Sequence, residues 1–217
     1  MLTLILENYQ AILSGFKITL FIFFTTVIFW ILCWVLFAYI SINNKRVKTI
    51  IDLVYIIFIS IPVIVLLFWF HYPLQIILNI TISPIITTIV TLSIINILGI
   101  YKIIYKKIKY IKEKYSNFSS IIGINTKNIR KKIEYPLLFR KSIDEVLSYQ
   151  INILHMTLFA SLISVNDIFR VAHQINASTY KSIEIYTLIG IIFLLISLSI
   201  NLLIIYLKKK YNYDYSG

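Results

Sequence analysis

The chain has 217 residues, of which 59% are hydrophobic and only 14% are charged, and its mean hydropathy is +0.85. A soluble globular domain is typically about 45–50% apolar and about 25% charged, so this composition excludes an ordinary soluble protein and indicates a lipid solvent. The net charge of +12 is divided among clusters between long uncharged runs, as in the loops of a membrane protein, and we expect no nucleic-acid partner.

The first 14 residues place apolar side chains at helical spacing, with Glu7 and Asn8 on the opposite side. This pattern predicts a short helix lying at the outer surface of the membrane. No cleavage site of small residues follows, so we expect no removable signal peptide.

Five apolar runs are long enough to cross a bilayer core of about 30 Å, which requires about 20 helical residues. We expect transmembrane helices over residues 18–40, 53–71, 84–104, 143–166 and 185–207. Pro84 opens the third helix, where proline leaves no hydrogen bond unmade. The sequence therefore predicts an all-α integral membrane protein of one domain, residues 1–217.

Lysine and arginine set the expected orientation. Of the 21 basic residues, 18 lie in the last turn of the first, third or fifth expected helix or in the segment that follows it. Because basic loops stay in the cytoplasm, we expect the N-terminus outside and the C-terminus inside. The polar segment 166–182 then lies outside, and we expect a short amphipathic helix in it.

A few polar or helix-breaking residues interrupt the apolar runs. His155 is the only ionisable residue of the fourth run, and such residues at membrane depth often act on a substrate or ion. Purely structural explanations for these residues stay open. The proline could form a packing bend, and the polar side chains, with Asn96, could form hydrogen bonds between helices. The candidate substrate-pathway residues are Pro62, Asn152, His155 and Thr157.

The sequence shows no constellation typical of an enzyme. It has no phosphate-binding glycine loop, no paired carboxylates within a span and no nucleophile beside an evident base. We expect no catalytic residue, no metal site and no cofactor bound by this chain. Cys33 is the only cysteine, which excludes an intramolecular disulfide.

The expected cytoplasmic loop, residues 105–136, carries the most specific pattern. From Asn117 it reads NFSSIIGINTKNIRKKIEYP, with apolar residues between basic ones. Gly123 is suited to end one helical stretch, and Asn125 or Thr126 to cap the next. Gly123 is followed by nine residues, an isoleucine at 133, one residue and Tyr-Pro.

This spacing resembles that of permease subunits of ATP-binding-cassette (ABC) importers of type I, in which Leu-Pro stands where this chain has Tyr135-Pro136. The resemblance implies that the loop forms a short coupling helix seated in a groove of a cytoplasmic ATPase subunit. The implied coupling residues are Asn117, Ser119, Gly123, Ile124, Asn125, Thr126, Ile133 and Pro136.

Further matches in chain order resemble the polar amino-acid branch of these permeases. They are Gly15 with Thr19, Ile59-Ser60-Ile61-Pro62, Pro136 with Arg140, His155 through Phe159, and Glu184-Ile185-Tyr186. The resemblance covers nearly the whole chain, and its weight comes from the shared order of the motifs.

The departures concern the family's binding charges. An arginine, a glutamate and an aspartate face the substrate in that family, and these positions fall on Ile59, Lys102 and Met156 here. The glutamate-alanine-alanine before the loop glycine is Asn117-Phe118-Ser119. Three explanations stay open: a different second permease chain supplies the charges, the substrate is less polar, or an identical pair uses other groups.

The resemblance implies a multi-pass permease of the bacterial cytoplasmic (inner) membrane that moves amino acids or related small solutes by ATP-driven alternating access. Its implied partners are a second permease chain, a cytoplasmic ABC ATPase dimer that binds ATP and Mg²⁺, an outer substrate-binding protein and membrane lipid. The alternatives are a methionine-type permease and a non-transporting membrane partner of an ABC ATPase, either a sensor or a structural subunit.

Overall fold

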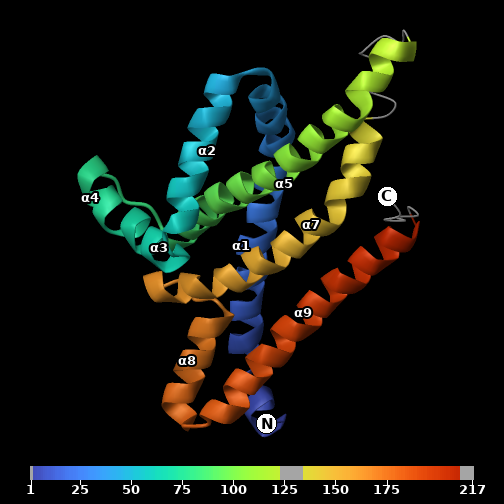
Figure 1. Cartoon of the computed structure of the whole chain (residues 1–217). Coiled ribbons are helices and arrows are strands. Elements are labelled where there is room, and N and C mark those ends of the chain that lie inside the picture. The colour runs from blue at the N-terminus through green and yellow to red at the C-terminus, as the bar shows by residue number, and fades with distance from the viewer. Residues whose placement is uncertain (1, 123–133, 211–217) are drawn as a thin grey trace.

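The computed structural model describes residues 2–122 and 134–210, with side chains for residues 4–28, 44–111 and 134–210. Every element in this part of the chain is helical (Figure 1). The elements are α1 (Leu2–Asn43), α2 (Lys45–Ser60), α3 (Val63–His71), α4 (Pro73–Leu78), α5 (Pro84–Ile122), α7 (Tyr135–Met156), the 3₁₀ helix η2 (Thr157–Ile163), α8 (Ile168–Thr179) and α9 (Ser182–Lys210).

The helices account for five membrane crossings when one bent pair is counted as a crossing. Four stretches are long and apolar enough by themselves: Leu4–Ile28, Pro84–Ile111, Tyr135–Ile163 and Ser182–Lys210. The fifth candidate joins Lys45–Ser60 to Val63–Leu78 at an angle of 99°. The all-α membrane fold expected from the sequence is therefore confirmed, and its second crossing is a broken one.

The break in the second crossing follows from Pro62. Helix α2 ends at Ser60, Ile61 is extended, and α3 begins directly after the proline. Proline lacks an N–H and its ring pushes the preceding residue out of the helical region, which explains the conformation of Ile61. The break at Pro62 is sharp enough to turn α3 almost perpendicular to α2.

Helix α1 is continuous from Leu2 to Asn43, so the separate surface helix predicted for the first 14 residues is wrong. Leu4 is 1% exposed and belongs to the same hydrophobic core as Ile22. The first turns therefore pack against the bundle instead of lying apart from it.

The middle of α1 meets the start of α8 at very short range. A Cβ atom on Gly15 would lie 2.9 Å from Ile168 Cα, so only glycine allows this approach. One turn further, Thr19 Oγ1 accepts the Ile168 N–H at 3.1 Å. Asp167 caps α8 by accepting the Arg170 N–H at 2.8 Å, and burial raises the pKa of this carboxyl to about 7. The helix expected within segment 166–182 is thus confirmed as α8.

Helix α5 is the central helix, packed against α1 and α7. Its second half buries a stripe of isoleucines at three- and four-residue steps, each at most 6% exposed, against Leu138 and Val146 of α7. These are Ile100, Ile104, Ile108 and Ile111. Residues 105–122, which we expected in the cytoplasmic loop, therefore continue α5 as helix.

Replacing Gly15 with leucine should destabilise the protein by about 1–3 kcal/mol, the usual cost of forcing extra atoms into a packed site. The matched control is Gly190→Leu in α9, because an added Cβ there has no neighbour within 4 Å. Thermal unfolding in detergent micelles measures both, and we expect a lower Tm for Gly15→Leu only. A similar fall for the two variants would contradict the close α1–α8 contact.

Candidate functional site

One face of α7 carries polar side chains at membrane depth. Ser148, Asn152 and His155 are all exposed, and their four- and three-residue steps place them on one side of the helix. Thr157 does not share this face, because it is buried and its hydroxyl donates to the Leu154 carbonyl at 2.7 Å. The structure thus brings Asn152 and His155 together and separates them from Thr157.

Helix α9 lies beside this face and is linked to it twice. His155 Nε2 lies 3.4 Å from Ser197 Oγ, and Lys208 forms an ion pair with Asp144 at 3.4 Å. The two links are separated by eleven residues on each helix, so the antiparallel helices run side by side over about 16 Å at 1.5 Å per residue. Asn201 is exposed on α9 between the links. We call Ser148, Asn152, His155, Ser197 and Asn201 the polar stripe.

The polar stripe needs a polar environment. Hydrocarbon offers no hydrogen bonds, so polar side chains inside a membrane normally face water or another protein chain. Among the described residues, the structure gives neither Asn152 nor Asn201 a side-chain hydrogen bond. The stripe is therefore a surface that lipid alone solvates poorly and that an aqueous path or a second chain would cover.

A buried amide pair lies on the opposite, inward side of α7. Asn96 of α5 and Gln150 of α7 exchange two hydrogen bonds, of 3.0 and 3.1 Å, and both are at most 3% exposed. The sequence drew our attention to Asn96 and not to Gln150. The pair could have been predicted from the presence of one amide side chain in each of two uncharged runs, because polar side chains in lipid form hydrogen bonds with one another.

In the part of the chain that the structure describes, ion pairs connect neighbouring helices at the end that the positive-inside rule places in the cytoplasm. They are Asp52 with Lys102, at 2.8 Å, Glu145 with Lys107, and Asp144 with Lys208. Lys102 stands where the permeases that this chain resembles have a substrate-facing glutamate, and here its ammonium contacts α2. Among the described residues, no three His, Cys, Asp or Glu side chains gather into a metal site.

The other predicted site residues are spread between helix ends and the undescribed loop. Pro62 is exposed at the break after α2, and Pro136 is exposed in the first turn of α7. Asn117 and Ser119 lie in the last turns of α5. Gly123, Ile124, Asn125, Thr126 and Ile133 lie outside the described residues.

Beyond Lys102, α5 continues to Ile122 for about 30 Å at 1.5 Å per residue. Figure 1 shows this part of α5 and the start of α7 converging at one corner of the molecule. The two helices thus carry the ends of the predicted coupling loop well away from the bundle.

The fold and the polar stripe define a class of protein: a multi-pass helical membrane protein with one polar face, as a solute permease has. A family described as "binding-protein-dependent transport system inner membrane component" matches residues 35–213. This match covers most of the chain. The chain belongs to that family, and it is a permease component of a transport system.

Characterised relatives support this assignment over almost the full length. The chain is 27% identical over 216 residues to the glutamate/aspartate import permease protein GltK of two Escherichia coli strains, O6:H1 and O157:H7. The alignments cover 95% of this chain and 96% of the relatives.

Solved structures share the fold. A chain of an amino acid ABC transporter crystallised with histidines superposes with a TM-score of 0.86 at 18% identity, covering 95% of this chain and 96% of that one. A chain of the inward-facing methionine ABC transporter MetNI gives 0.73 at 17% identity, covering 93% and 98%. The ABC type I permease fold implied by the sequence is therefore confirmed.

Replacing Asn96 or Gln150 alone with leucine should destabilise the protein by about 1–2 kcal/mol, because the remaining amide stays buried without its partner. The double variant should recover most of that loss, since neither amide is then left unpaired. Unfolding of the three variants in mixed micelles completes a double-mutant cycle. Strictly additive losses would contradict the pairing.

Proposed function

We propose that this chain is one permease subunit of an ABC importer for amino acids or related small solutes in a bacterial cytoplasmic membrane. It pairs with a second permease chain, with two cytoplasmic ATPases that bind ATP and Mg²⁺ and carry out the hydrolysis, and with an outer substrate-binding protein. Its N-terminus lies outside and its C-terminus inside. The observation that carries the proposal is the exposed polar stripe in a chain of this permease family.

The comparisons favour polar amino acids over methionine as the substrate class. The relatives named for import of glutamate and aspartate align with 95% of this chain. The amino acid transporter chain superposes with a TM-score of 0.86, against 0.73 for the methionine transporter. Two exposed asparagines and a histidine on the stripe also suit the carboxylate or amide side chain of a polar amino acid better than the apolar thioether side chain of methionine.

The proposed substrate pathway runs along the polar stripe, with Asn152 and His155 among its exposed hydrogen-bonding groups. A second permease chain facing this stripe would enclose a polar path between the two chains. The stripe has no lysine or arginine, so we assign the missing binding charges to a different second chain. Pro62 and Thr157 act indirectly, by breaking the second crossing and by fixing the turn from α7 into η2.

Coupling to ATP hydrolysis follows from the arm built by α5 and the start of α7. The coupling residues around Gly123 lie outside the described residues, in the segment that joins α5 to α7, and we propose that an ATPase binds this segment. Because the arm is helical and tied to α2 and α7 by ion pairs, motion at its tip would be passed into the bundle as a rigid-body movement. Alternating exposure of the polar stripe would then move the solute.

Purification of the full chain from native membranes, with mass spectrometry of what accompanies it, tests the assembly. We expect an ABC ATPase and a second, different permease chain. An ATPase with this chain alone would instead show an identical pair. Failure to recover any ATPase, under conditions that keep a control importer intact, would overturn the proposal.

His155→Leu should lower solute uptake about tenfold or more, because it removes a charge-capable hydrogen-bonding group from the pathway, whereas His155→Gln should retain part of it. Uptake into vesicles measures this, with co-purification of the ATPase as the control for assembly. Normal uptake by His155→Leu would remove His155 from the pathway. An assembled complex that takes up none of the amino acids would favour the non-transporting alternative.

A further inference from the structure

The turn that joins α3 to α4 holds a hydrogen-bonded cluster that the transport mechanism does not use. Gln75 Oε1 accepts the Ile82 N–H at 2.8 Å, and Gln75 Nε2 lies 3.1 Å from His71 Nδ1. Thr87 Oγ1 lies 3.3 Å from both nitrogens. The cluster ties the hairpin of α3 and α4 to the start of α5.

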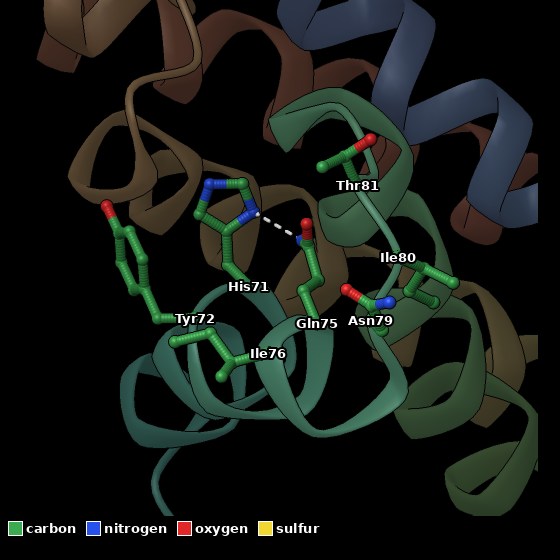
Figure 2. Close-up of a pocket in the computed structure, with 7 residues that line it drawn as sticks. All are labelled: His71, Tyr72, Gln75, Ile76, Asn79, Ile80 and Thr81. Atoms are coloured by element: carbon green, nitrogen blue, oxygen red, sulfur yellow. Dashed lines mark hydrogen bonds between the residues drawn. The ribbon is translucent and has the colours of Figure 1, made fainter.

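The cluster fixes the tautomer of His71. Because the Gln75 carbonyl oxygen is occupied by Ile82, its NH₂ group faces Nδ1 and can only donate. Nδ1 is then the acceptor, and the proton of the neutral ring sits on Nε2. Figure 2 shows this second nitrogen on the side of the ring away from Gln75, where it is a hydrogen-bond donor without a described partner.

His71 also lines a pocket at this turn. The pocket has a volume of about 480 Å³ and is lined by His71, Tyr72, Gln75, Asn79 and Thr81, with Ile76 and Ile80 on its apolar side (Figure 2). The lining offers the hydroxyls of Tyr72 and Thr81 and the amide of Asn79 beside the His71 ring, and it includes no lysine, arginine or carboxylate. Such a site suits an acceptor-rich group, for example a phosphodiester, by hydrogen bonds and not by net charge.

An apolar groove continues from this pocket. Tyr72 also lines a hollow of about 460 Å³ whose other walls are Ile64, Val65, Phe68, Trp69 and Pro73. Val65 and Trp69 in turn line a third hollow of about 410 Å³, inside the elbow between α2 and α3, together with Ile57, Phe58 and Ile61. The pocket and the two apolar hollows therefore adjoin one another around the elbow, with Tyr72 as one shared wall and Val65 and Trp69 as the other.

The position of this hollow matches the headgroup region of the membrane. Thr87 is fifteen residues before Lys102 on α5, about 22 Å along the helix, so the pocket lies near the far side of a core of about 30 Å. Trp69 and Tyr72 are exposed there, as aromatic residues at membrane interfaces are. Ile76 and Ile77 are 80% and 68% exposed, which water would disfavour and lipid would not.

We propose that the elbow and the α3–α4 hairpin bind one phospholipid, with its phosphodiester in the His71 pocket and an acyl chain in the groove past Trp69. The uncharged lining matches a net-neutral headgroup, whose ammonium can donate hydrogen bonds to the oxygens of Asn79 and Thr81. The site therefore favours phosphatidylethanolamine over phosphatidylglycerol. This binding depends on the membrane location of the chain and not on which solute it transports.

Native mass spectrometry of the intact transporter complex, reconstituted in equal parts of phosphatidylethanolamine and phosphatidylglycerol, tests the proposal. The wild type should retain phosphatidylethanolamine in preference. His71→Phe should weaken that retention about 3- to 10-fold, the effect of one hydrogen bond. Val65→Trp, which fills the groove from an exposed position, should abolish it, and Leu202→Trp on exposed α9 should not change it.

The outcomes separate this site from the proposed function. Equal lipid retention by Val65→Trp, Leu202→Trp and the wild type would overturn the lipid site even if the chain transports amino acids. A photoreactive phenylalanine in place of Trp69 should form adducts with phospholipid. Adducts with a protein chain would show that the groove is a protein interface and would also overturn the proposal. Retained lipid with no preference between headgroups would overturn the assignment to a net-neutral phospholipid.

Discussion

The reciprocal amide pair between Asn96 and Gln150 fixes the seam on which the bundle depends. Inside a membrane, apolar contacts alone leave two helices free to slide, whereas a pair of complementary amides has one satisfied register. The same seam is packed by Tyr149 against Gly99 and closed by the ion pair between Lys107 and Glu145. With α5 and α7 held in this register, the inward side of α7 is fully used, and its other side is left to carry the polar stripe.

The two ends of the bundle are held by different chemistry. At the predicted cytoplasmic end, charged groups of α2, α5, α7 and α9 pair with one another where headgroups and water can solvate them. At the predicted outer end, α8 is held by a backbone approach at Gly15, the Thr19 hydroxyl and a buried cap at Asp167. The second crossing is broken between these ends, and its second half runs at 99° to its first half.

The crossings could be predicted from the lengths of the apolar runs. The start of α5 at Pro84 and the break at Pro62 could be predicted from the positions of the prolines. The course of the first 14 residues was not, because an amphipathic stripe looks the same whether it faces lipid headgroups or a neighbouring helix. The extension of α5 past residue 104 was readable in the isoleucine spacing but was masked by the lysines between them. The contacts of His155 with Ser197 and of Lys102 with Asp52 depend on which helices become neighbours, which no local pattern specifies.

The length of α5 on either side of Lys102 has a mechanical consequence. Eighteen residues separate Lys102 from the start of the helix at Pro84, and twenty separate it from Ile122. The ion pair with Asp52 thus lies near the midpoint of α5. If α5 tilts about that point, its two ends move by nearly equal distances in opposite directions. A displacement of the cytoplasmic end of α5 would then move the α3–α4 hairpin, at the other end of α5, by a similar distance.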